Sequence, residues 1–423
     1  MLRAFLNAFK VPDLRRKILF TVAIIAVYRL GSWVPAPGVD FTAIRSAAEG
    51  ASGLTAIINL FSGGALTQMA VFALGIMPYI TSSIIMQLLT VVIPRLEQWQ
   101  KEGESGQRKI TQWTRYLTVA LAVLQSSGLT VLARNGTLFG TDVMPNATAW
   151  TIVLIVITLT AGTAFIMWLG ELITQRGVGN GMSLLIYVSI ISQLPAQGGA
   201  VLASNGAATF AMIMVLGLLI TLAVVYIEQG QRRIPVQYAR RQVGRRVYGG
   251  QSTYIPLKVN QAGVIPIIFS SSLLYLPTLA ASIATWDWLI RMNDRYLANP
   301  SSFVYIAVFA ILTIFFTYFY TAIAFNPVEV ADNIKRYGGF IPGIRPGRAT
   351  AEYLDRVLSR ITLPGSLYLT AVAVIPYAAI AIANVQQFPL GGISLLIVVG
   401  VALETMKQIE SQLLQRNYEG FLA

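Results

Sequence analysis

Residues 54–68 read LTAIINLFSGGALTQ, and residues 71–93 read VFALGIMPYITSSIIMQLLTVVI. The second stretch has about the 20 apolar residues that a helix needs to cross a bilayer. The first is too short and too polar to cross, because Asn59 and the Ser-Gly-Gly run at 62–64 would leave polar groups unpaired in lipid. Such a segment is tolerated only inside protein or beside water. The two stretches predict a half-inserted segment that lines a cavity, followed by a membrane-spanning helix.

The composition places the whole chain among polytopic membrane proteins. Of its 423 residues, 55% are hydrophobic and only 12% are charged, and the mean hydropathy is +0.64. An average soluble domain has about twice that share of charged residues. The chain has no cysteine and no histidine, which excludes disulfides, thiolate or imidazole metal sites and His- or Cys-based catalysis. The sequence predicts no metal site and no cofactor.

Ten apolar spans are predicted along the chain. A basic amphipathic segment at 1–17 precedes the first span and is expected to lie on the membrane surface. Arg29 and the turn at 35–38 replace the cleavage site of a signal peptide, so the first span is expected to stay in the mature protein. The spans fall near 18–34, 71–93, 116–133, 148–169, 178–194, 207–227, 262–281, 303–325, 363–383 and 393–410.

The charges are distributed unevenly over the two sides of this topology. With ten spans, both termini and the segments 94–115, 170–177, 228–261 and 326–362 lie on one side. That side carries the whole net charge of +13, and it holds all of the 31 lysines and arginines except Arg29, Arg45, Arg134, Arg291 and Arg295. Positive loops stay in the cytoplasm. The termini and these four segments are therefore predicted to be cytoplasmic.

Two spans echo each other in sequence. Residues 75–85 read GIMPYITSSII and residues 263–273 read GVIPIIFSSSL, with Gly, Pro, Ile and a Ser pair in matching places. Their spans, the second and the seventh, run in opposite directions. Inverted halves with Gly- and Pro-broken helices enclose a central pathway in many transporters, which predicts halves at 1–195 and 196–423. The alternative is that Gly, Pro and Ser only serve helix packing.

The span centres carry neutral polar side chains and no ionisable ones, which argues against a proton or ion pathway. The sequence has no His-Glu-x-x-His and no Gly-x-Ser-x-Gly motif, so an enzyme is not expected. It also has no Gly-x-x-x-x-Gly-Lys-Ser/Thr motif, so any ATP is hydrolysed by another protein. What the pathway carries is left open by these observations.

Two long basic segments lie on the predicted cytoplasmic side. Residues 232–246 read RRIPVQYARRQVGRR, and residues 335–348 read KRYGGFIPGIRPGR. Paired arginines with interleaved tyrosines suit ribosomal RNA phosphates, an acidic protein surface or anionic lipid headgroups. Charge alone does not choose among these partners. The plain alternative is that both segments only fix the orientation of the chain in the membrane.

Seven segments, in order along the chain, resemble those of the bacterial SecY family. They are NLFSGGAL at 59–66, ALGIMPYITSSI at 73–84, KEGESG at 101–106, GVGNGMS at 177–183, RIPVQY at 233–238, KVNQAGVIP at 258–266 and GFIPGIRPG at 339–347. The resemblance implies an all-α polytopic membrane protein. Its ten transmembrane helices form two inverted five-helix halves around a central pore, with a short plug helix at about 54–68.

The resemblance also implies a function. The family is a passive channel that passes unfolded secretory proteins across the membrane, releases membrane-protein helices sideways into it and is driven by a partner motor or ribosome. The implied partners are SecE and SecG subunits, the SecA motor ATPase, the ribosome, signal sequences, nascent chains and membrane lipids. The implied location is the bacterial inner membrane, with both termini cytoplasmic. A small-solute transporter and a scaffold without a pore stay as alternatives.

Matching motif positions carry the family's site residues onto this chain. The pore ring is Ile80, Ile84, Ile186, Ile190, Ile268 and Ile397. The plug includes Asn59, Phe61, Ser62, Gly63 and Gly64. The lateral gate, between spans two and three on one side and seven and eight on the other, is lined by Gln87, Gln125, Ser126, Asn260, Ser271 and Ser272. The partner-binding residues are Arg232, Arg233, Arg240, Arg241, Arg345 and Arg348.

Overall fold

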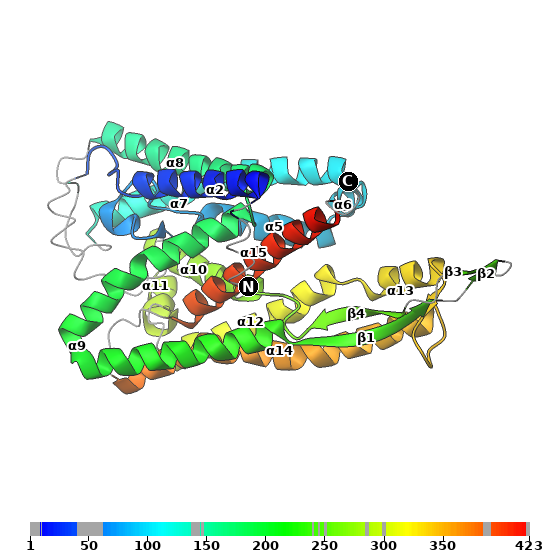
Figure 1. Cartoon of the computed structure of the whole chain (residues 1–423). Coiled ribbons are helices and arrows are strands. Elements are labelled where there is room, and N and C mark those ends of the chain that lie inside the picture. The colour runs from blue at the N-terminus through cyan, green and yellow to red at the C-terminus, as the bar shows by residue number, and fades with distance from the viewer. Residues whose placement is uncertain are drawn as a thin grey trace.

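Long helices dominate the structure, with a small sheet at one end of the bundle (Figure 1). The computed structural model describes residues 9, 11–39, 62–136, 144, 148–238, 241–243, 246–248, 252–283, 287–297, 302–383 and 391–419. The helices that coincide with predicted spans are α2 (Pro12–Gly31), α5 (Met77–Val92), α7 (Glu104–Arg134), α8 (Ala149–Arg176), α9 (Gly181–Gln229), α10 (Ile265–Ile283), α12 (Phe303–Ala324), α14 (Arg348–Ala383) and α15 (Gly392–Glu419).

Helix α9 accounts for two of the ten predicted spans. Gly206 has φ 80° and ψ 170° in its interior, a left-handed conformation that glycine adopts without strain. The helix therefore turns back on itself, and Figure 1 shows its two arms meeting at a sharp angle. The first arm holds the predicted span at 178–194, and the second holds the span at 207–227.

By length and hydropathy alone, six of the described helices could cross a membrane. A seventh qualifies if α5 and α6 (Pro94–Lys101), which meet at 100°, are counted together. This count takes the bent α9 as one helix. Helix α2 is not among the six. It starts at Pro12, inside the predicted surface segment, so it contains basic residues as well as the apolar run. Proline at N1 and Asp13 in the first turn favour a helix start there.

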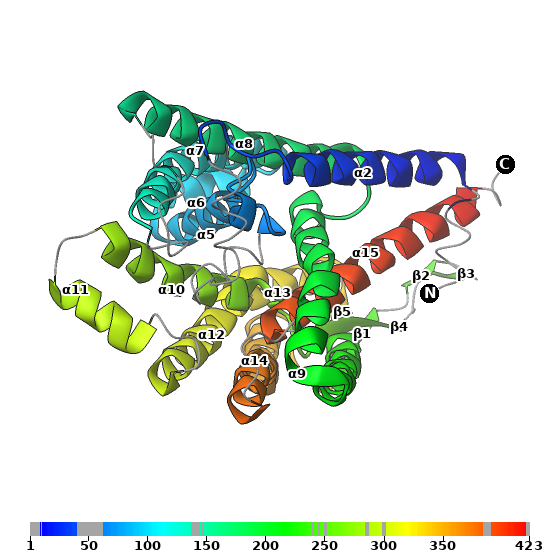
Figure 2. The same cartoon turned by 90° about the vertical axis from the view of Figure 1, so that its left-hand side faces the viewer.

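The helices form two groups around a central pair. Figure 2 shows α2, α5, α7 and α8 on one side and α10, α12 and α14 on the other. Between the groups lie α15 and the first arm of α9, which contact each other along their lengths. The first group and the first α9 arm come from the N-terminal part of the chain, and the rest come from the C-terminal part.

The two basic segments fold together into one body, here called the sheet unit. Strands β1 (Gln231–Tyr238) and β4 (Ser252–Lys258) pair antiparallel, and β5 (Gly339–Phe340) joins the other edge of β1. Helix α13 (Pro327–Arg336) and the start of α14 cover the sheet. The strands alternate, so Ile234 and Val236 of β1 point into a shared apolar core. A hairpin of β2 (Arg241–Val243) and β3 (Arg246–Tyr248) extends beyond the sheet.

The sheet unit was not predicted, although the mostly helical fold class was. Pro235 lies within β1 and would argue against a strand there. It is tolerated because β5 pairs only with Gln237 and Tyr238, so one edge of β1 has no partner strand at Pro235. The remaining short elements are η2 (Leu66–Gln68), α11 (Asp287–Met292) and η3 (Asn293–Leu297).

Candidate functional site

Five of the six predicted ring isoleucines meet in one apolar cluster at the centre of the molecule. Ile186 and Ile190 come from α9, Ile268 from α10 and Ile397 from α15. Ile80 of α5 packs against them. The four cluster members are between 1% and 8% exposed. Side chains from four helices, drawn from both parts of the chain, thus close the centre with aliphatic groups alone.

The sixth residue, Ile84, lies in an adjoining cluster. It is buried with Phe269 of α10 and Phe316 of α12, and Ile80 packs against this cluster too. Because Ile80 and Ile84 are four residues apart, they share one face of α5. The two clusters are therefore continuous through Ile80.

A cavity of about 390 Å³, here called the vestibule, lies next to the predicted ring. Ile80, Ile84, Ile186 and Ile268 form part of its wall. The rest of the wall is largely polar. Its members include Ser83, Gln87, Thr111, Arg115, Glu171, Thr174, Gln175, Asn180 and Ser183.

The polar part of the vestibule lies toward the predicted cytoplasmic side. Helices α5 and α8 end on that side, and α7 and α9 begin there. Gln87 and Glu171 lie near the ends of α5 and α8, and Arg115 and Asn180 lie near the starts of α7 and α9. At 1.5 Å per residue, they are closer to that side than the ring is. The vestibule thus has its polar residues toward the predicted cytoplasmic side and the predicted ring isoleucines in its wall.

The described part of the predicted plug lies next to the ring. Asn59 and Phe61 fall outside the described residues, whereas Ser62, Gly63 and Gly64 are described. Gly63 and Gly64 have φ of 66° and 89°, so this part consists of turns leading into the short helix η2 rather than a continuous α-helix. Ala65 belongs to the same cluster as the ring isoleucines.

Arg29 connects this segment to two helices. From the end of α2, its Nη1 donates to the Gly63 carbonyl oxygen at 3.0 Å and to Ser192 Oγ of α9 at 2.9 Å. The neighbouring Tyr28 hydroxyl lies 2.6 Å from Ser189 Oγ. A side chain at Gly63 would have its Cβ 3.2 Å from Ser189 Cα. The Gly63 carbonyl of the predicted half-inserted segment is thus satisfied inside protein.

Hydroxyl groups connect helices within each side of the predicted gate. On one side, Ser82 Oγ of α5 donates to the Thr114 carbonyl oxygen of α7 at 2.7 Å. On the other, Thr313 Oγ1 of α12 lies 3.2 Å from Ser270 Oγ of α10, and each of these hydroxyls also donates to a carbonyl of its own helix. Helices α5 and α7 form one pair, joined by a hydrogen bond, and α10 and α12 form another, joined by a hydroxyl contact.

The contact of α5 with α10 and α12, here called the seam, is an apolar cluster. It contains Ile84, Phe269 and Phe316, with Leu88 and Leu312 packed beside them. The rings of Phe269 and Phe316 meet edge to face, with centroids 5.6 Å apart. The expected hydrogen bonds between neutral polar side chains across the gate do not occur in this part of the structure.

Three of the predicted gate residues, Ser126, Ser271 and Asn260, use their polar groups elsewhere. Ser126 Oγ lies 3.2 Å from Thr160 Oγ1 of α8, and Ser271 Oγ donates to the Ile268 carbonyl of its own helix. Asn260 Nδ2 donates to Glu228 Oε1, at the end of α9, at 2.5 Å. Ser272 and Gln125 are buried, and Gln87 is exposed in the vestibule. Ser272 Oγ is buried without a hydrogen-bond partner among the described residues. Serines in helices can bond the carbonyls of their own helix, as Ser271 does, instead of a side chain across the gate.

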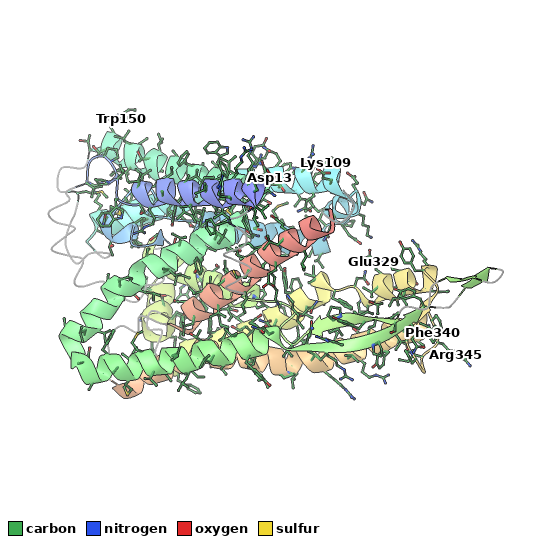
Figure 3. The ribbon with its side chains drawn as sticks, in the orientation of Figure 1. Asp13, Lys109, Trp150, Glu329, Phe340 and Arg345 are labelled. Atoms are coloured by element: carbon green, nitrogen blue, oxygen red, sulfur yellow. The ribbon has the colours of Figure 1, made fainter. Side chains whose placement is uncertain are left out.

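The predicted partner-binding arginines lie on the surface of the sheet unit. Arg232 and Arg233 are exposed on β1, and Arg233 Cζ lies 4.8 Å from the centroid of the Tyr254 ring. Arg345 is exposed in the turn between β5 and α14, and Figure 3 shows it at the far end of the unit. Arg348 Nε donates to Glu352 at 2.9 Å. Arg240 lies outside the described residues, and Arg241 falls in β2.

The SecY family model matches residues 70–406 of the chain. The chain belongs to the SecY family. The protein translocase subunit SecY of Streptomyces scabiei is 57% identical over 442 aligned residues, and that of Mycobacterium tuberculosis strain H37Rv is 54% identical over 440. Both alignments cover 100% of each chain. The chain is therefore a translocase channel subunit, not a catalytic enzyme, and a multi-pass membrane protein.

Solved structures confirm the fold at lower sequence identity. A protein-conducting channel is matched with a TM-score of 0.65 and 16% identity, over 93% of this chain and 91% of that one. A SecY protein whose plug domain is described as maintaining a membrane seal gives 0.62 and 18% over the same shares. Sec61 in a canine ribosome–channel complex gives 0.61 and 15%, again over 93% and 91%. This last relative is bound to a ribosome.

Sequence reasoning within the SecY family missed three features of the site. It placed Arg29 at a span end without a role. It counted Ser82 and Ser270 only among the neutral polar groups of the spans. It did not predict that Ser82 connects α5 with α7 or that Ser270 contacts α12. It also treated the basic segments as separate. The alternation of Ile234 and Val236 was the one signal in the sequence for the strand between them.

Proposed function

We propose that a translocating polypeptide enters the vestibule, passes through the ring of six isoleucines and leaves either on the far side or sideways through the seam. The observation that carries this proposal is the meeting of four helices, α5, α9, α10 and α15, in an aliphatic collar at the bottom of a polar funnel. The two halves that move apart are residues 1–195 and 196–423.

The ring suits a cargo of any sequence. A narrow aliphatic constriction dewets, so it resists ions when no chain fills it. It makes no hydrogen bond to a passing chain and so selects no particular side chain. The collar therefore seals the resting channel and yields to an extended polypeptide.

The seam suits lateral release. Because α5 and α7 are joined by a hydrogen bond and α10 and α12 by a buried hydroxyl contact, each pair moves as a unit, and the apolar contact between the pairs is the part that separates. An inserting signal helix is itself apolar and replaces the packing lost on opening. It shifts the equilibrium by its higher affinity for the open state.

The sheet unit is the docking platform for the driving partner. Its exposed arginines suit an acidic protein surface or ribosomal RNA, and the ribosome-bound relative supports the second. The SecA motor would supply ATP hydrolysis, since the chain has no phosphate-binding loop motif. SecE and SecG complete the complex in the bacterial inner membrane, with both termini and the sheet unit in the cytoplasm.

The test compares two isoleucine substitutions in purified complexes rebuilt into sealed vesicles. Ile268→Asn puts an amide into the collar, where it eases wetting and removes apolar packing. The control is Ile311→Asn, because Ile311 of α12 is 67% exposed. Losing buried aliphatic packing costs about 2–5 kcal/mol, and about 1.4 kcal/mol shifts the closed-to-open ratio tenfold. We expect Ile268→Asn alone to raise ion leak and the export of a signal-defective preprotein. Equal effects of both variants would refute the ring.

A further inference from the structure

The vestibule holds one pair of opposite charges in an otherwise neutral wall. Among the described residues that line the vestibule, the charged ones are Arg115 of α7 and Glu171 of α8. Arg115 Nε donates to Glu171 Oε1 at 2.8 Å, and Nη2 donates to Oε2 at 2.5 Å. The remaining wall is apolar or carries hydroxyls and amides. The two charges are thus matched by a two-bond contact.

This pair is accessible to a chain in the vestibule. The Arg115 side chain is 37% exposed and that of Glu171 is 14% exposed. The surrounding cytoplasmic side carries the whole net charge of +13. Without Glu171, that positive charge would continue into the funnel at Arg115. A guanidinium cannot lose its proton at neutral pH, so only a partner carboxylate can mask it.

We infer that Glu171 keeps the vestibule from discriminating between cargo charges. By masking Arg115, it lets acidic and basic segments of cargo pass with similar ease. The inference rests on the proposed passage of polypeptide through the vestibule. A bare Arg115 would bind glutamates and aspartates of the cargo and repel its lysines and arginines. A bare Glu171 would do the reverse. The pair therefore acts on the passing chain rather than on the closed state of the pore.

The helix packing beneath the pair does not depend on it. Helices α7 and α8 also share a buried apolar cluster containing Leu129, Leu132, Ile155 and Leu159. Ser126 and Thr160 add a hydroxyl contact at 3.2 Å. A Glu171→Gln change keeps the side-chain volume and leaves these contacts in place. Its effect on charge can be measured in a folded channel.

The test uses sealed vesicles containing the whole complex with its motor, and three preproteins that differ only in a block of lysines, glutamates or glutamines in the mature part. The variants are Glu171→Gln, Arg115→Gln and both together. The matched control is Glu104→Gln, which breaks the Arg108–Glu104 pair on the same helix outside the vestibule, with side chains 79% and 83% exposed.

We expect Glu171→Gln to slow the lysine cargo relative to the glutamate cargo by about two- to fivefold, the size of a partly screened charge contact. Arg115→Gln should reverse the sign, and the double variant and Glu104→Gln should treat all three cargoes as the unaltered channel does. The split should shrink as salt rises. Equal slowing of all cargoes, or no change in either single variant, would overturn the inference. Failure of the unaltered channel to carry even the glutamine cargo would instead count against the proposed function.

Discussion

The contacts inside each helix pair and the contacts between the pairs are made of different chemistry. Within α5/α7 a hydroxyl of one helix donates to the other, and within α10/α12 two buried hydroxyls lie in contact. Across the seam, the described contacts are aliphatic and aromatic. Hydrogen bonds fix relative position because they have direction, whereas apolar contacts can be exchanged for those of another apolar helix. The difference predicts where the molecule opens and where it stays rigid.

The strongest way to disturb this comparison is to remove apolar packing from the seam. Ile84 is 9% exposed and is buried with Phe269 and Phe316. Ile84→Ala should weaken the closed state by about 2–4 kcal/mol. Because the lost packing is on the side that separates, export of signal-defective preproteins should rise at least about tenfold. The measurement is initial export rate into vesicles at equal amounts of inserted complex.

The control for this change is Ile311→Ala on the exposed face of α12. It removes the same number of carbon atoms from a position outside the seam. If both variants raised export equally, loosening of the whole bundle would explain the effect, and the seam would have no special role.

A smaller effect is expected at the plug. Arg29→Met removes the bonds to the Gly63 carbonyl and to Ser192 Oγ. Hydrogen bonds from a charged donor contribute about 1.5–3 kcal/mol. The ring isoleucines remain in place, so resting ion conductance in planar bilayers should increase while preprotein transport continues.

The matched substitution is Arg134→Met, which removes an exposed arginine at the end of α7 on the same predicted side. It should leave conductance unchanged. A resting conductance of Arg29→Met equal to that of the unaltered channel would show that this arginine does not hold the plug.

How much could be predicted from the sequence depended on how far apart along the chain the contacting residues lie. The closeness of Ile80, Ile84 and Ile268 could be predicted, because they lie inside motifs that recur within matching helices. The sheet unit could not be predicted, because Gln237 pairs with Phe340 although α10, α11, α12 and α13 lie between them along the chain. The polar gate stays a prediction, because the chemistry of each hydroxyl depends on its surroundings. A list of serines in membrane helices does not reveal whether each hydroxyl bonds its own helix, as Ser271 does, or a neighbour, as Ser82 does.

The smallest effect is expected for a change inside a helix pair. Such a change tests directly whether the contacts within a pair differ in role from those across the seam. Ser82→Ala removes the bond from α5 to the Thr114 carbonyl. That carbonyl still accepts from Thr118 Oγ1 at 2.7 Å, so no buried acceptor is left unpaired. The loss should be about 1 kcal/mol. Thermal unfolding in detergent should report it as a small decrease in stability, with ion leak and signal-defective export unchanged.

Thr313→Val gives the same test on the other side of the seam, since it removes the hydroxyl that contacts Ser270 Oγ while nearly keeping the side-chain volume. Both variants reduce stability within a pair and leave the apolar seam intact. If either raised signal-defective export as far as Ile84→Ala, the pairs would not move as units. Opening would then run through α5/α7 or α10/α12 instead of between them, and the hydrogen bonds rather than the aromatic contacts would control the gate.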